Sequence, residues 1–275
     1  TTRGPNRVSV IDAAVAISPV EEFLRFCSAS FAGPEEGLDD YVFFTGEEAN
    51  DTVDGVQRGF AVVLNTRTGE HTAVPGMGRL NHETTIVVPG GWDDGLVMLT
   101  TDDTFSGPSA QLYMYVAADQ DAIFDDEGSL HALRITGVDG VPLVDAADPF
   151  NGANDYLDLD VGEEFQGAFI DVPDAIADGD QTVLEDWSND NNVFQAIRLE
   201  DAAYDKNDPR TVYIADTGRS RVVPDPVTGR MVRGPGGTEG LADNGRIFKM
   251  VLNADDPMVV DSLTIMADGD LEGTE

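Results

Sequence analysis

Short runs of β-branched and aromatic residues recur along the whole chain, and they constrain its fold more than any other feature. Gly, Pro, Asp and Asn separate these runs at a spacing of roughly ten to fifteen residues, which is typical of an all-β domain. Helical patterns do not alternate with them, so a doubly wound sheet is not favoured. The segments predicted to be strands are Tyr41–Phe44, Gly59–Leu64, Thr84–Val88, Leu96–Thr100, Gln111–Val116, Thr211–Ala215, Arg246–Leu252 and Ser262–Met266.

Helical signals are scarce. Residues Ser18 to Phe26 are predicted to be helical because Ser18 and Pro19 suit the start of a helix and acidic residues follow in its first turn. A second short helix is predicted at Phe165 to Ile170. Residues 119–180 are otherwise poor in strand signals and rich in Asp, Gly and Ala, so they are predicted to be an insertion or long loops within a single domain covering residues 1–275.

Hairpins in series point to a β-sandwich or a β-propeller. Thr66–Gly69 and Asp225–Gly229 have the composition of hairpin turns between strands. A propeller blade takes about 40–50 residues, so a chain of this length would supply about six blades. The final residues, 268–275, are polar and follow directly on a strand-like run. The pattern is therefore compatible with an all-β sandwich or with an all-β propeller of about six blades, and the polar ending predicts that the last blade is missing from this chain.

The charge balance restricts the partners. The chain has 52 Asp and Glu residues against 16 Lys and Arg, a net charge of −36 with His neutral. Such a surface repels phosphate backbones and anionic lipids, which argues against nucleic acid as a partner. No apolar run approaches the ~18 residues of a membrane span. The acidity itself is compatible with a saline habitat, with binding of hard cations, or with a plain solvated surface.

Carboxylates stand next to several of the predicted strands. Glu47 and Glu48 follow the first run, Glu83 precedes the third, Asp102 and Asp103 follow the fourth, and Glu200 precedes a later strand. In a propeller the innermost strands converge on a central channel, where several carboxylates share one site only if cations neutralise them. Oxygen ligands select calcium, magnesium or manganese, and ferric iron is also compatible. Phosphate-loop, nucleophile-elbow and zinc-protease motifs are absent from the sequence.

The order of these motifs resembles that of the PhoX-type alkaline phosphatases and their bacterial relatives. The resemblance extends from about Arg25 to Met266 as scattered motifs. The segments that carry it are Thr45–Glu48, Arg58–Phe60, Gly78–Val88, Thr101–Phe105, Leu112–Val116, Arg198–Asp201, Tyr204–Asp205, Val212–Gly218 and Gly245–Phe248. The most specific are the Gly-Arg-x-x-His-Glu stretch ending at Glu83 and the Asp pair before a Tyr-x-Tyr strand.

The resemblance implies a secreted or periplasmic six-bladed propeller that hydrolyses small phosphate monoesters with a calcium and iron cluster (Ca²⁺ and Fe³⁺) in its channel. It implies that Arg79 and Arg198 hold the phosphate. The metal ligands it implies are Glu47, Glu48, Glu83, Asp102 or Asp103, and Glu200.

One position departs from the family. The phosphatases have a cysteine close to the first Glu pair, where this chain has Gly46. The single cysteine, Cys27, is expected to be a small buried residue outside the site. This departure motivates an alternative, a non-enzymatic secreted propeller in which calcium is structural and the protein acts as a binding or assembly module. The oligomeric state stays open.

Overall fold

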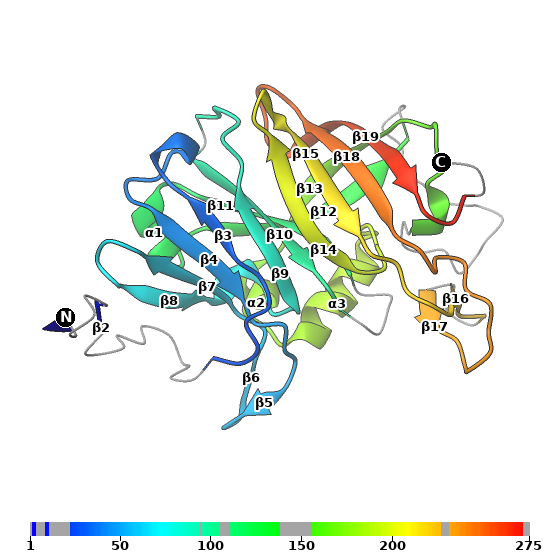
Figure 1. Cartoon of the computed structure of the whole chain (residues 1–275), viewed down its shortest axis with the longest axis horizontal. Helices are drawn as coiled ribbons and strands as arrows, with labels where there is room; N and C mark the ends of the chain where they lie inside the picture. The colour runs from blue at the N-terminus through cyan, green and yellow to red at the C-terminus, as the bar shows by residue number, and fades with distance from the viewer. Residues whose placement is uncertain are drawn as a thin grey trace.

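A computed structural model describes residues 2–3, 9–10, 23–93, 95–104, 110–137, 156–226 and 231–271. Within these ranges the chain is mostly β (Figure 1), which confirms the prediction of a β-rich fold. Each of the eight runs expected to be a strand lies in or overlaps one. The hairpin predicted at Thr66–Gly69 joins two neighbouring strands, whereas Asp225–Gly229 extends beyond the described residues.

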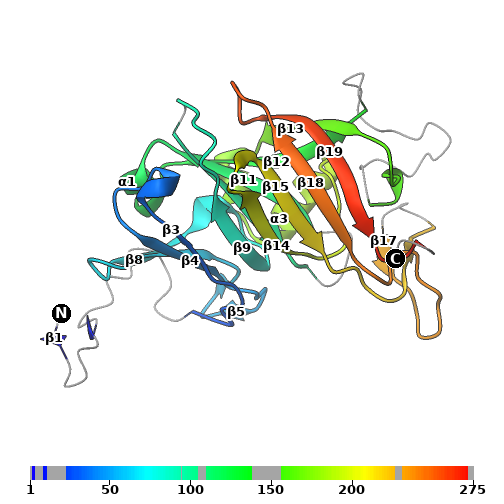
Figure 2. The same ribbon diagram turned by 45° about the horizontal axis from the view of Figure 1, so that its top comes forward.

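Nine antiparallel strands form the main sheet. Their order across the sheet is β14-β15-β18-β19-β13-β12-β11-β10-β9. The two outermost strands, β14 and β9, contact each other, so the sheet is nearly closed in the manner of a barrel (Figures 1 and 2). The strands are β9 (His82–Val87), β10 (Leu96–Asp102), β11 (Leu112–Ala117), β12 (Ser129–Thr136), β13 (Phe165–Asp171), β14 (Leu199–Asp205), β15 (Asp208–Asp216), β18 (Arg246–Leu252) and β19 (Val259–Asp268).

A smaller antiparallel sheet packs beside β9. Its strands follow in chain order: β3 (Ser30–Ala32), β4 (Val42–Gly46), β7 (Ala61–Asn65) and β8 (His71–Val74). Both β3 and β4 contact β9. Three two-stranded pairs complete the β structure: β1 (Thr2–Arg3) with β2 (Ser9–Val10), β5 (Thr52–Val53) with β6 (Val56–Gln57), and β16 (Val222–Pro224) with β17 (Met231–Arg233).

The helices are few and short. The α-helices are α1 (Gln120–Phe124), α2 (Asp174–Ala177) and α3 (Gln181–Asp190), and the 3₁₀ helices are η1 (Pro34–Glu36), η2 (Pro75–Met77) and η3 (Tyr156–Asp158). Asp119 caps α1 by accepting a hydrogen bond from the backbone of Ala122. No helix in the described ranges has both the length and the apolar character needed to cross a membrane.

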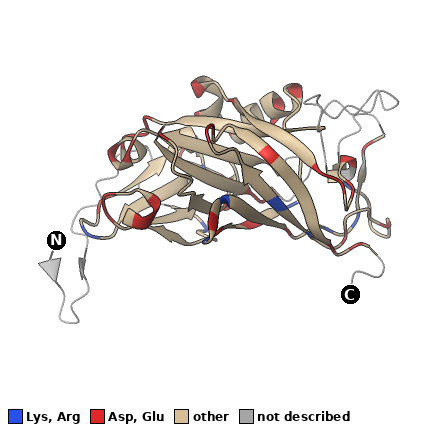
Figure 3. Ribbon diagram, turned by 90° about the horizontal axis from the view of Figure 1, so that it is seen from above, with Lys and Arg blue, Asp and Glu red and all other residues tan. Residues whose placement is uncertain are grey.

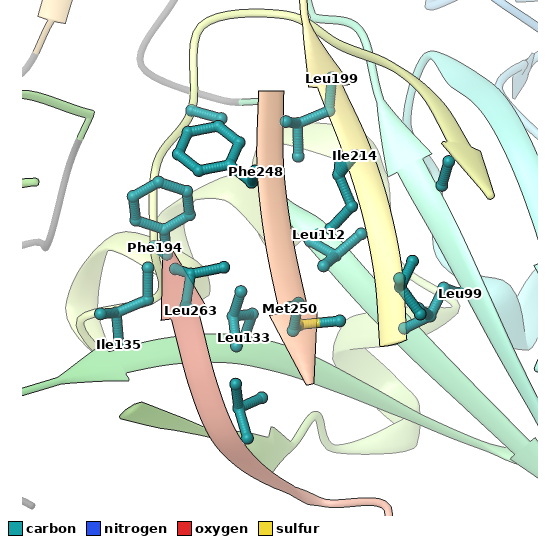
Figure 4. Close-up of a cluster of buried hydrophobic side chains, with 14 of the residues drawn as sticks. Leu99, Leu112, Leu133, Ile135, Phe194, Leu199, Ile214, Phe248, Met250 and Leu263 are labelled. Atoms are coloured by element: carbon teal, nitrogen blue, oxygen red, sulfur yellow. The ribbon is translucent and has the colours of Figure 1, made fainter. Parts of the chain in front are cut away.

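Two large cores fill the space on either side of β10 and β11. Leu99 and Leu112 face into the nearly closed sheet, where they pack with Phe248 and Met250 (Figure 4). Their chain neighbours Met98 and Tyr113 face the other way, into a core shared with the four-stranded sheet and the helices. Because successive side chains of a strand point to opposite faces, strands buried on both faces are apolar throughout.

Two local predictions were wrong. Phe165 to Ile170 forms β13 instead of a helix, because Phe165, Gly167 and Phe169 are buried in alternation, which is the period of a strand. A Cβ on Gly167 would lie 2.8 Å from the carbonyl oxygen of Arg134 on the paired strand, so the glycine permits that close approach. Residues 119–180 are also more than an insertion, because they contribute β12 and β13 to the middle of the main sheet. Residues 138–155 within them lie outside the described part.

The helix predicted at Ser18 to Phe26 falls largely outside the described residues. The portion that is described, from residue 23 onward, is not helical, and Phe26 forms an isolated β-bridge with Glu47. Acidic residues are distributed along the helices and loops around the molecule, with few basic residues among them (Figure 3). This distribution agrees with the strongly negative net charge.

Candidate metal centre

Four carboxylates and one thiol come together where the two sheets meet. Cys27, Glu48 and Glu83 each offer a ligand atom, and these atoms lie within 4.8 Å of one another. Glu83, Asp103 and Glu200 form a second such group with the same limit. Glu83 belongs to both groups, so it is the centre of the cluster. Five separate segments of the chain supply these side chains.

Backbone pairing around Asn81 positions three of the carboxylates. Asn81 precedes β9 and forms a β-bridge with Glu48. The backbone N–H of Asp103 donates to the carbonyl oxygen of Asn81 at 3.0 Å, and the side-chain amide of Asn81 donates to the carbonyl oxygen of Asp103. Glu83 lies two residues further along β9. Glu48, Asp103 and Glu83 are therefore held around one short stretch of chain.

Two threonines attach the fourth carboxylate. The hydroxyl of Thr101 on β10 accepts from the backbone of Thr84 on β9 and donates to the carbonyl oxygen of Glu200 on β14, at 2.9 and 3.1 Å. The hydroxyl of Thr84 donates to Asp201 at 3.0 Å. These bonds cross the contact between the outermost strands of the main sheet. They fix Glu200 next to Glu83.

Cys27 takes part in the cluster, contrary to its expected role as a buried apolar residue. It is exposed and lies before β3, with its backbone N–H directed at the carbonyl oxygen of Gly46 at 3.4 Å. A side chain at Gly46 would not fit, because its Cβ would lie 2.3 Å from the Cβ of His82. The thiol therefore comes from the segment before β3, which lies beside the position at which the family resemblance implied it. The only sequence signal for it was that the chain has one cysteine.

Burial and neighbouring carboxylates raise the pKa values of Glu83 and Cys27 in the cluster. Burial raises the pKa of Glu83 to about 7, and the nearby charges of Glu200, Glu48 and Asp103 add to this while a hydrogen bond with Cys27 opposes it. The pKa of the Cys27 thiol rises to about 12, first through its hydrogen bond to Glu83 and then through burial and Glu48. Several carboxylates in one place disfavour their own ionisation, and a bound cation reverses that effect.

Arg198 provides the positive charge at one side of the cluster. Its Nε and Nη2 donate to the two carboxylate oxygens of Asp103 at 2.8 and 2.7 Å, and Nη2 also lies 2.6 Å from Glu200. These contacts raise the pKa of the guanidinium. Asp103 is buried, so this bidentate ion pair neutralises a charge that would otherwise be costly.

Two predicted ligands lie outside both groups. Glu47 is fully buried, and its carboxylate accepts hydrogen bonds from the backbones of Leu24, Gly59 and Phe60. Asp102 is also buried, and it accepts a hydrogen bond of 2.7 Å from Thr104. Burial raises the pKa of Asp102 well above its usual range. In each acidic pair, then, the second residue joins the cluster and the first supports the local backbone, because adjacent side chains point in opposite directions along an extended chain.

Arg79, the other predicted phosphate ligand, is placed away from the cluster. Its guanidinium carbon lies 3.7 Å from the centre of the Phe60 ring, and its Nη1 donates to the carbonyl oxygen of Gln57 at 2.6 Å. His82 is structural as well. Burial lowers its pKa to about 4, and its ring nitrogens face Thr100 and the carbonyl oxygen of Gly78.

The donor set fits a hard cation. Carboxylate oxygens are the ligands that calcium prefers, and an adjacent thiolate is compatible with iron. The residues that could hold such ions are Glu48, Glu83, Asp103, Glu200 and Cys27. Exposed acidic groups also gather without a metal, whereas Glu83, which both groups share, is buried.

Comparisons with models of protein families, with curated proteins and with solved structures found no match to this chain.

Proposed function

We propose that this protein is an extracytoplasmic, metal-dependent phosphoesterase of the PhoX type. The observation that carries the proposal is the convergence of Glu48, Glu83, Asp103 and Glu200 around one point, with Arg198 beside them. These are five of the eight residues that the family resemblance implied, and they come from segments far apart in the sequence.

Four-stranded meanders, the unit of a propeller blade, recur along the chain, and two of them are joined through β13 in the nearly closed main sheet. Three four-stranded meanders follow one another along the chain: β3-β4-β7-β8, β9-β10-β11-β12 and β14-β15-β18-β19. Their first strands lie close together, since β9 contacts both β3 and β14. The candidate site lies at this meeting point, as it would in the channel of a propeller. Six blades stay a prediction.

Each residue has a role in this proposal. The carboxylates would hold calcium, and Cys27 with Glu83 and Glu48 would hold iron. Bound cations would neutralise the phosphate and supply an activated oxygen nucleophile. Arg198 is partly exposed, and its guanidinium pairs with Asp103 and Glu200, so it would exchange these partners for phosphate oxygens when substrate binds. It would orient a phosphate monoester against the metal centre.

The test combines metal analysis with turnover. Calcium and iron are measured by plasma mass spectrometry, and hydrolysis of p-nitrophenyl phosphate is measured before and after chelation. The double variant Glu83→Gln, Glu200→Gln should lose both metal and activity, whereas the exposed Glu163→Gln serves as the matched control. Full activity in the double variant would refute the phosphoesterase.

A second function has one observation in its favour. Arg198 already pairs with Asp103 and Glu200, so this part of the cluster is compensated in the absence of a substrate. A protein in which calcium only stabilises the junction of the sheets would have this arrangement. Calcium without iron and without chelator-sensitive turnover would favour this binding or assembly module.

A further inference from the structure

Two buried arginines lie together outside the metal centre. Arg58 follows β6 and is 4% exposed, and Arg79 follows η2 and is 8% exposed. Backbone pairing brings them together, because the N–H of Leu80 donates to the carbonyl oxygen of Gly59 at 3.2 Å, and the charge of Arg58 contributes to a lowered pKa of Arg79. Arginine is rarely buried to this degree without a partner for its charge.

Their guanidinium groups are incompletely paired. In Arg58, Nε and Nη1 are buried and donate to no acceptor among the described residues. In Arg79, Nε is likewise buried and unpaired, while Nη1 donates to the carbonyl oxygen of Gln57. Each buried donor without an acceptor costs on the order of a lost hydrogen bond, and more when the group is charged.

Three carboxylates and an aromatic ring lie near Arg79, but none of them accepts from the buried unpaired donors. Burial lowers the pKa of Arg79, while Asp180, Asp178 and Glu47 raise it, and the guanidinium stacks on the Phe60 ring at 3.7 Å. The oxygens of Glu47 already accept three backbone hydrogen bonds. The pair of arginines therefore has buried N–H donors without acceptors among the described residues.

Gln57 holds the side chain of Arg79 in place. Helix α3 begins at Gln181, and the backbone N–H of this residue donates to the side-chain oxygen of Gln57 at 3.0 Å. The carbonyl oxygen of the same Gln57 receives the hydrogen bond from Arg79. These two bonds link Arg79 to the first turn of the helix.

We propose that Arg58 and Arg79 form a binding site for a tetrahedral oxoanion such as phosphate or sulfate. A guanidinium presents paired N–H donors that match the oxygens of such an anion, and an anion neutralises both charges at once, which a water molecule does not do. The site is separate from the metal centre, where Arg198 is the basic residue. It does not depend on the proposed phosphoesterase activity.

The experiment measures thermal unfolding of the whole chain in chelator, with sulfate, phosphate, acetate or chloride at equal ionic strength. Sulfate and phosphate should raise the unfolding midpoint by about 4 °C or more at a hundred times the dissociation constant. Arg58→Met should abolish this rise, and Arg210→Met, which removes a partly exposed arginine elsewhere, should retain it. Arg58→Lys keeps the charge without the fork and should raise the dissociation constant at least about tenfold.

Several results would overturn the site. One is an equal midpoint in chloride and sulfate, and another is a response to acetate as large as that to sulfate. A response that is lost in Arg198→Gln but kept in Arg58→Met would assign the anion to the metal centre. If Arg58→Met does not fold, an unchanged dissociation constant in Arg58→Lys refutes the proposal. A protein without phosphatase activity that still responds to sulfate would refute the proposed function alone.

Discussion

Replacing Glu83 with Gln should stabilise the metal-free protein above neutral pH. Glu83 is buried among Glu48, Asp103 and Glu200, and its pKa rises from the usual 4.5 to about 7. Below pH 4.5 the carboxyl is protonated in both the folded and the unfolded chain, so it has no effect on stability there. Between these two pKa values the unfolded chain releases the proton while the folded chain retains it. Stability therefore falls as the pH rises through this window.

The size of the expected change in stability follows from the raised pKa of Glu83. One pKa unit corresponds to 1.36 kcal/mol, so ionised Glu83 costs the folded state about 3 kcal/mol above pH 7. Gln cannot ionise and has a similar shape, so Glu83→Gln should recover most of this in chelator at pH 8. At pH 4.5 the variant and the parent protein should be nearly equal. Excess calcium should reverse the order at pH 8, because the cation stabilises the protein that retains the carboxylate.

The measurement is urea unfolding at both pH values, with and without calcium. Glu163→Gln is the matched control, since Glu163 is exposed and should change stability by less than about 0.5 kcal/mol. A Glu83→Gln protein that is less stable than the parent at pH 8 in chelator would refute the like-charge interpretation of the cluster. So would a calcium effect that is equal in the two proteins.

Three further predictions concern the neighbours of Glu83. Arg198→Gln leaves the buried Asp103 without its partner, so it should lower the free energy of unfolding in urea by about 3 kcal/mol. The control Arg210→Gln, at a more exposed pair, should lower it by about 1 kcal/mol or less. Equal losses in the two variants would contradict the importance of the buried ion pair. At pH 8 in chelator, iodoacetamide should alkylate Cys27 at least about tenfold more slowly in the folded protein than in urea, because the pKa of the folded thiol rises to about 12. Mass spectrometry measures the two rates. Similar rates would count against the contact of Cys27 with the carboxylates. Gly46→Cys should lower the unfolding midpoint by several degrees, since its Cβ would overlap the facing strand, and an unchanged midpoint would mean that the strands are spaced differently.

The strands were predictable where the signal is local. Runs such as Leu96–Thr100 and Arg246–Leu252 consist of residues that suit a pleated surface, and turn residues bound them. Phe165 to Ile170 was misassigned because a short apolar run has no clear period on its own. Its pairing with β12 and β19, far away along the chain, makes it a strand.

The sequence predicted the type of ligand at the candidate site, but only some of the residues that supply it. Acidic pairs beside strands indicated oxygen ligands, but the sequence did not distinguish Glu47 from Glu48 or Asp102 from Asp103. That choice depends on which side chain faces the junction of the sheets, and backbone pairing with Asn81 settles it. Cys27 was missed because its proximity to Glu83 arises from strand pairing and leaves no mark in the spacing of residues.

The amino-acid sequence alone was enough for the β class, for the acidic surface and for most strand positions. Propensity, alternation and turn chemistry act over a few neighbouring residues, so they can be recognised without a fold. The sheet order, the nearly closed barrel and the meeting of Glu83 with Glu200 needed the folded chain. They arise from hydrogen bonds and burial between segments far apart in the sequence, whose free energy is gained only when all of them are in place.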